Sequence, residues 1–226
     1  VFLVMNTSYF TRDNLHRVVF SLKQALSGEE TEDVLLFEDS GENMYGIFKD
    51  GLVVLSNRSL SVYDASGSLL SETGIHFYEP VLRVSEHYIL CFDRGGSGLL
   101  LCDSFGIVRE KSFEKDDYSY SILDAQFGAG GKISVITDSP NAKGVVYVYS
   151  EMLEELYEFS SVDSYPVRAD IFDKNTLSVV SLSPRKELSD LLFYRIDYRT
   201  GEGYQSPVYS VEDRFPVSFV AEDGRL

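Results

Sequence analysis

A pattern of four short strands recurs along this chain and limits the possible folds more than any other feature. A polar turn follows the third strand of each repeat, and these turns begin at Asp64, Asp103, Ser150 and Asp197, at intervals of 39, 47 and 47 residues. Four antiparallel strands within roughly 40 to 50 residues match one blade of a β-propeller. The sequence therefore predicts an all-β, β-propeller-like fold with about four to five four-stranded antiparallel blades. The alternative is a β-sandwich, which has similar turn spacing.

The predicted strands are rich in β-branched and aliphatic residues and are bounded by turn residues. Their ranges are 44–48, 52–55, 60–63 and 68–73, then 80–84, 88–92, 99–102 and 107–113, then 122–127, 133–137, 145–149 and 155–159, and finally 166–171, 177–182, 191–196 and 204–208. A fifth repeat starts at Pro216 with a single strand, and Val1–Met5 is a candidate for a strand that would complete it. We expect one propeller-like domain over residues 1–226, with an N-terminal region at 1–38 and the repeats at 39–226, as a piece of a longer chain.

One amphipathic helix is predicted in the N-terminal region. Its apolar residues follow the spacing of a single helical face, and they are Leu15, Val18, Val19, Leu22 and Leu26. Thr11 or Asp13 is a candidate N-cap, and Gly28 lies just beyond the predicted end. We expect this helix to pack on the outside or the edge of the sheets.

The charge balance disfavours two classes of partner. The chain has 36 Asp and Glu against 20 Lys and Arg, for a formal net charge of −16. Nucleic acid and anionic lipid are both bound through clustered basic residues, and the sequence contains no such cluster. We therefore expect no nucleic-acid partner. The apolar runs of the sequence extend over about five residues, whereas a membrane-spanning helix needs roughly 20.

Cys91 and Cys102 flank a glycine-rich turn. A register that places them opposite each other on adjacent strands makes a cross-strand disulfide geometrically possible. The preferred interpretation is two buried free thiols, because free cysteine behaves as a small apolar residue.

Residue types used in catalysis and metal binding occur without the spacing that such sites need. His16, His76 and His87 are scattered, and no Gly-x-Ser-x-Gly sequence is present. The acidic turns at 114–117 and 170–175 do not match a calcium-binding loop. The glycine-rich segment 93–98 precedes a strand rather than a helix, which indicates a hairpin turn instead of a phosphate-binding loop. We expect no catalytic residues, no metal ligands and no cofactor.

Aromatic and acidic residues stand immediately before the first strand of successive repeats. In a propeller these connections lie at one face around the central channel, where ligand sites commonly form. The candidate binding residues for a sugar, a peptide or a cation are Tyr78, Glu79, Tyr118, Tyr120, Tyr165 and Phe215. The alternative is that these rings pack between the blades.

Three segments together carry a family resemblance: residues 10–15, the predicted strand that begins with Pro80 and Val81, and residues 88–96. From about Asn6 onward, the chain resembles an uncharacterised family of domains of unknown function from Gram-positive bacteria, which is distantly similar to quinoprotein-type and WD-repeat propellers. The resemblance implies a domain that follows one N-terminal transmembrane helix and lies on the extracytoplasmic face of a membrane. It assigns no catalytic residues.

These observations favour a noncatalytic recognition or scaffold module with a protein, peptide or carbohydrate ligand. One alternative is an enzyme with its site at the propeller channel, either a hydrolase or a quinone-dependent oxidoreductase. The chain contains no Trp, which disfavours the quinone enzyme, because quinoproteins of the resembling class usually stack a Trp on the cofactor. The other alternative is an intracellular protein-interaction propeller.

Overall fold

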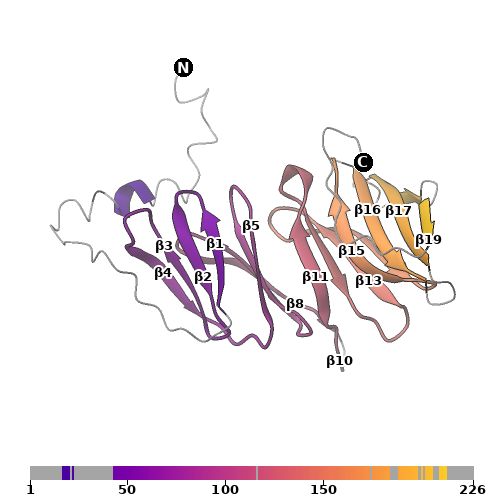
Figure 1. Cartoon of the computed structure of the whole chain (residues 1–226), viewed down its shortest axis with the longest axis horizontal. Coiled ribbons are helices and arrows are strands. Elements are labelled where there is room, and N and C mark those ends of the chain that lie inside the picture. Colours follow the sequence, from indigo (N-terminus) through magenta and orange to yellow (C-terminus); the bar gives the residue numbers. More distant parts are fainter. Residues whose placement is uncertain are drawn as a thin grey trace, which may run out of the picture.

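Four antiparallel sheets stand side by side as the blades of an open arc (Figure 1). The structure, a computed structural model, describes residues 17–20, 22, 43–115, 117–173, 175–183, 188–197, 200, 202–205 and 209–212. Blade 1 and blade 4 lie at opposite ends of the arc in Figure 1. The predicted propeller-like fold is confirmed, and each blade is a meander in which consecutive strands pair.

The strands of the first two blades follow the predicted repeats. Blade 1 contains β1 (Met44–Phe48), β2 (Gly51–Leu55), β3 (Ser59–Tyr63) and β4 (Leu69–Gly74). Blade 2 contains β5 (Pro80–Val84), β6 (Ile89–Asp93), β7 (Gly98–Asp103) and β8 (Gly106–Ser112). A small hairpin that the sequence did not predict, β9 (Glu114–Lys115) and β10 (Tyr118–Ser119), follows blade 2.

Blade 3 contains β11 (Ile122–Phe127), β12 (Ile133–Thr137), β13 (Gly144–Tyr149) and β14 (Glu155–Ser161), with a short 3-10 turn at Ala129–Gly131. Blade 4 contains β15 (Tyr165–Ile171), β16 (Thr176–Leu182), β17 (Leu188–Asp197), β18 (Glu202–Gln205) and β19 (Tyr209–Glu212). Both β18 and β19 pair with β17. The prediction of one outer strand at 204–208 is therefore wrong. Residues 206–208, between these two strands in the sequence, lie outside the described residues.

The first strands of the blades lie next to one another along the inner side of the arc. Strand β5 lies beside β1 and β11, and β15 lies beside β11 and β12. Three apolar clusters fill the spaces between successive blades. Each cluster takes side chains from both neighbouring blades, so burial of apolar area between sheets holds the arc together.

The predicted helix is described only at residues 17–20 and 22, which are helical. Its Arg17 Nη1 lies 2.6 Å from Asp50 Oδ1 in the β1–β2 turn, and the Phe20 ring lies 6.5 Å from that of Phe105 in the β7–β8 turn. The helix thus contacts blade 1 and blade 2 at one end of the sheets. The strands predicted at Val1–Met5 and from Pro216 lie outside the described residues.

The recurrent turns after the third strands use one short acceptor side chain to hold the backbone. Asp64 Oδ1 accepts the N–H groups of Ser66 and Ser68, each at 2.9 Å. In blade 3, Ser150 Oγ takes the same role for the N–H of Glu154, at 3.1 Å. The third turn lacks a glycine, and Leu153 adopts a left-handed φ of 61° in its place.

Asp173 provides a pH-dependent contribution to the β15–β16 turn. Its Oδ1 accepts the N–H groups of Asn175 at 2.7 Å and Thr176 at 2.8 Å, and the bond from Asn175 is the main cause that lowers the pKa of this carboxyl. A lowered folded-state pKa stabilises the protein above the unfolded pKa, and this stabilisation is lost as pH falls through the folded value.

We expect the difference in unfolding free energy between wild type and Asp173→Asn to be constant above about pH 5 and to shrink below about pH 4. Urea unfolding at several pH values measures it. A difference that stays constant down to about pH 3 would contradict this role of the carboxylate.

The two cysteines are free and buried, which agrees with the preferred interpretation of the sequence. The register that would place the two cysteines opposite each other does not occur: Cys91 pairs with Leu100, and Cys102 pairs with Ile89. The reason is the turn, in which the N–H of Gly96 donates to the carbonyl of Asp93 and Gly95 has a φ of 82°. Diagonal neighbours across a ladder lie roughly 7 to 8 Å apart, which is longer than a disulfide normally spans.

Both thiols should be unreactive in the folded protein. Burial raises the pKa of Cys91 well above its usual value and raises that of Cys102 to about 12, so almost no thiolate is present near neutral pH. We expect an aromatic disulfide reagent to titrate no thiol in native protein and two thiols in guanidinium without reductant. Failure to titrate either thiol after unfolding would indicate a disulfide.

Candidate functional site

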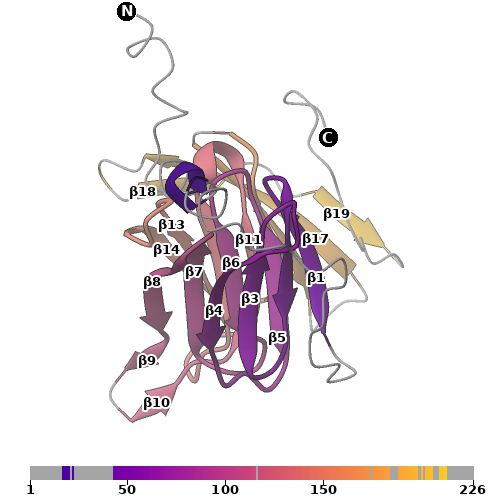
Figure 2. The ribbon, with the colours of Figure 1, turned by 90° about the vertical axis from the view of Figure 1, so that its left-hand side faces the viewer.

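A cleft of about 620 Å³ opens between the outer parts of blade 2 and blade 3. The connection between these blades, 113–121, is longer than the other two inter-blade connections, 75–79 and 162–164, and it contains the β9–β10 hairpin. Figure 2 shows the hairpin projecting beyond the end of the sheets. The volume of the cleft is in the range of small-ligand sites.

The hairpin is fixed to both blades at its base. The N–H of Tyr120 donates to the carbonyl of Phe113 at 2.7 Å, which places these two residues side by side. Asp138, in the β12–β13 turn, accepts the N–H of Ser121 at 2.8 Å and the hydroxyl of Tyr118 at 3.4 Å. Since these bonds hold the connection to blade 3, one side of the cleft has a defined position.

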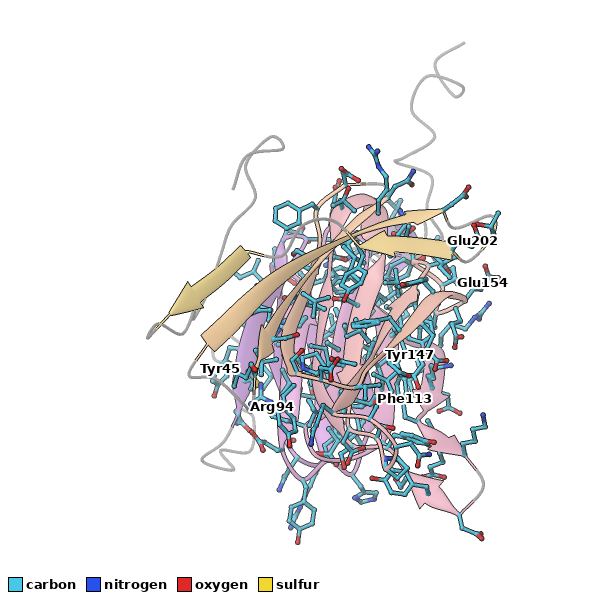
Figure 3. All side chains as sticks on the ribbon, turned by 90° about the vertical axis from the view of Figure 1, so that its right-hand side faces the viewer. Tyr45, Arg94, Phe113, Tyr147, Glu154 and Glu202 are labelled. Carbon is cyan, nitrogen blue, oxygen red and sulfur yellow. The ribbon has the colours of Figure 1, made fainter. Side chains whose placement is uncertain are left out.

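Three aromatic rings form an inner corner of the cleft. Tyr147 and Tyr149 alternate on β13, so both face blade 2, and their rings are stacked with centroids 5.9 Å apart. The Phe113 ring meets them at interplanar angles of 54° and 72°, at 5.5 and 6.2 Å. Tyr147 and Phe113 are neighbours in Figure 3. The result is a corner with one wall from blade 3 and one from the start of the connection that follows blade 2.

A cation of the chain itself occupies this corner. Lys111 Nζ lies 4.8 Å from the centroid of the Tyr149 ring and 5.5 Å from that of Phe113. Both distances are within the range of a cation–π interaction. In the described part of the chain no carboxylate lies within ion-pair distance of Lys111. The ring faces therefore supply the stabilising contact for this ammonium group.

Two exposed carboxylates stand along the blade 3 side of the corner. In the β13–β14 ladder Glu155 pairs with Tyr149 and Glu158 pairs with Tyr147, so the acids share the face of the two rings. Both acids line the cleft, and neither has a hydrogen-bond or ion-pair partner among the described residues. The remaining lining residues are Ser112, Glu114, Lys115, Tyr120, Ser139, Asn141, Ala142, Val145, Ser160 and Val162.

Burial and the nearby carboxylates also shift the pKa values of the Tyr147 and Tyr149 hydroxyl groups. Burial, followed by the charges of Glu158 and Glu155, raises the pKa of Tyr147 to about 12. Tyr149 is fully buried, its pKa is raised for the same reasons, and within the described residues its hydroxyl has no hydrogen-bond partner. A buried hydroxyl without a partner is uncommon and costs free energy, so it marks a place where a ligand or water can bond.

Two of the predicted binding residues meet at this cleft. Tyr120 lines it, and the Tyr118 ring packs edge-on against Tyr120 with centroids 4.8 Å apart. The sequence identified them as aromatic residues before the first strand of blade 3. Their assignment as ligand-binding residues stays a prediction.

The other predicted residues lie at different inter-blade junctions. Tyr78 and Glu79 precede β5; Asp93 Oδ1 accepts both of their N–H groups, and Glu79 pairs with Arg94 at 2.9 Å. The Tyr78 side chain is 97% exposed, so it does not pack between blades. Tyr165 begins β15, where Lys143 Nζ lies 5.0 Å from its ring centroid. Phe215 lies outside the described residues.

Sequence reasoning missed most of the corner. Tyr147 and Tyr149 fell within a predicted strand, and their alternation was a signal that both rings share one face. The spacing of Lys111 and Phe113 is the same. What no single strand reveals is which strand of the neighbouring blade lies opposite.

The described residues contain no group of three or more His, Cys, Asp or Glu side chains placed to hold a metal ion. Within the same residues no helix has the length and hydropathy needed to cross a membrane. The cleft therefore offers aromatic, carboxylate, ammonium and hydroxyl groups as its chemistry.

Comparison with protein families identifies the family of this chain. Residues 23–212 match DUF5711, a family of unknown function. The chain belongs to the DUF5711 family. No curated protein matches it. The match spans all four described blades.

Solved structures similar to this DUF5711 chain are propellers or carry comparable folds. They include the Dos1 propeller (14% identity, TM-score 0.53, 80% of this chain and 51% of that chain) and a eukaryotic initiation factor (9%, 0.53, 75% and 42%). Hsv2 of Kluyveromyces lactis with loop 6CD replaced by a Gly-Ser linker also matches (15%, 0.52, 74% and 58%). The chain spans about half the length of these structures. At such identities the similarity shows the fold alone.

Proposed function

We propose that this DUF5711 domain is a noncatalytic recognition or scaffold module that binds a protein partner through the cleft between blade 2 and blade 3. The observation that carries the proposal is the aromatic corner beside two carboxylates that have no ion-pair partner among the described residues. Aromatic and charged groups that converge in a concave site are typical of binding pockets. The module acts without a cofactor.

We place the module on the extracytoplasmic face of a bacterial membrane, held there by an anchor in its full-length protein. The resemblance of the sequence to anchored propeller domains supports this location. Accessibility of the full-length protein to protease added to intact cells tests it. Complete protection of the domain, with cleavage after lysis, would favour an intracellular interaction module instead.

Site-specific photo-cross-linking in cells tests the binding function. Val162 lines the cleft and is 65% exposed, whereas Leu69 on β4 is 46% exposed and lies on blade 1. We expect a photoreactive residue at position 162 to give a discrete adduct that Tyr149→Leu abolishes, and the same residue at position 69 to give none. Equal adducts from both positions, or an adduct that survives the loss of Tyr149, would overturn the proposal.

A further inference from the structure

The geometry points to the aromatic corner as a receptor for a basic side chain of the partner, a lysine or an arginine, with Lys111 as its internal occupant in the free protein. This inference rests on the proposed recognition function and names the chemistry of the partner. Phe113, Tyr147 and Tyr149 are the walls, and Glu155 and Glu158 are the acids at the mouth.

Lys111 shows that the corner stabilises an ammonium group. Its Nζ lies over two ring faces at 4.8 and 5.5 Å and has no carboxylate within ion-pair distance among the described residues. Aromatic faces attract cations because the ring quadrupole is negative at its centre. An anionic ligand would instead meet the negative ring faces and two carboxylates.

The acids make the corner suitable for a second cation. Glu155 and Glu158 share the face of Tyr149 and Tyr147, and their carboxylates are unpaired within the described residues. The chain carries a formal net charge of −16, so long-range attraction also favours a basic partner. The incoming cation either displaces the half-buried Lys111 side chain or lies beside it between the rings and the acids.

The Tyr149 hydroxyl supplies a polar contact for the arriving group. Tyr149 lines the cleft, and its buried hydroxyl lacks a partner among the described residues. An ammonium or guanidinium group can donate to this oxygen while its alkyl stem packs on the Phe113 ring. This combination distinguishes a basic side chain from an apolar one of the same shape.

Titrations with capped tripeptides test the inference. The probes are N-acetyl-Gly-X-Gly-amide with X as lysine, trimethyl-lysine, norleucine or glutamate, and the readout is the ring-current shift of the probe in NMR. We expect the lysine and trimethyl-lysine probes to bind on the order of tenfold more tightly than norleucine, and the glutamate probe not to bind.

Variants sharpen the result. Lys111→Met removes the internal competitor and should strengthen binding of the cationic probes. If the corner instead bound anions through Lys111, the same substitution would remove the residue that anion binding needs. Glu158→Gln should weaken binding about two- to threefold, and the matched change Glu72→Gln on exposed β4 should leave it unchanged. Tyr149→Leu should abolish binding; if its unfolding curve differs from wild type, Phe113→Leu takes its place.

Three results would overturn the assignment: equal binding of norleucine and lysine, loss of cationic binding in Lys111→Met, or binding of a neutral disaccharide in place of every cationic probe. An adduct at position 162 in cells without any binding of the cationic probes would leave the recognition function standing and remove only the cationic partner. Absence of both would remove both proposals.

Discussion

Phe92→Ala should lower the unfolding free energy by about 3 to 5 kcal/mol. Phe92 is fully buried on β6, and its cluster draws side chains from both blade 2 and blade 3. Truncation removes the buried ring and leaves a cavity that two rigid sheets cannot close. Urea unfolding followed by far-ultraviolet circular dichroism measures the change.

Ile47→Ala is the matched control for Phe92→Ala. Ile47 also lies in a strand, β1, but its side chain is 77% exposed, so its truncation should cost less than about 1 kcal/mol. Similar costs for the two substitutions would mean that packing between blades contributes little to stability.

Gly51→Ala is the second substitution with a large expected effect, a loss of about 3 kcal/mol or more. Gly51 begins β2, and a Cβ at this position would overlap the carbonyl oxygen of Tyr63 and come within 3.1 Å of the Asp64 Cα. These are backbone atoms of the last residue of the paired strand β3 and of the residue that follows it, so relief requires that the backbone itself moves. Thermal unfolding of the purified variant measures the loss.

Gly74→Ala separates this steric effect from the general cost of changing a glycine. Gly74 ends β4 in the same blade, and no atom lies within 4 Å of the place where its Cβ would stand. Alanine restricts the unfolded chain, so this variant should be unchanged or more stable by about 0.5 kcal/mol. If Gly51→Ala matches it, the close approach of β2 and β3 is not a constraint.

The repeat pattern was sufficient to predict the blades. In the first three repeats every predicted strand agrees with the structure to within two residues at each end, because alternating apolar residues and turn residues are local signals. The partner of Cys91 could not be predicted because the conformation of one four-residue turn decides the register of its hairpin. Two other turns are held by a side chain that accepts backbone N–H groups, namely that of Asp173 and that of Ser150.

The candidate site was predictable only in part. Tyr118 and Tyr120 were recognised by their position in an inter-blade connection, and the structure brings their rings together. The corner itself depends on Lys111 and Phe113 lying opposite Tyr149, a contact between residues of different blades that no local pattern encodes. Contacts between residues that are far apart in the sequence are decided only when the complete sheets pack against each other.

The connection that contains the β9–β10 hairpin is under different structural constraints from the blade sheets. The blade sheets depend on inner-strand packing and tight turns, whereas residues 113–121 lie between sheets and form one wall of the cleft. The entropy of closing a loop rises only slowly with its length. This junction is therefore an insertion point: its hairpin can be lengthened or exchanged to reshape the mouth of the cleft while the ladders on either side keep their register.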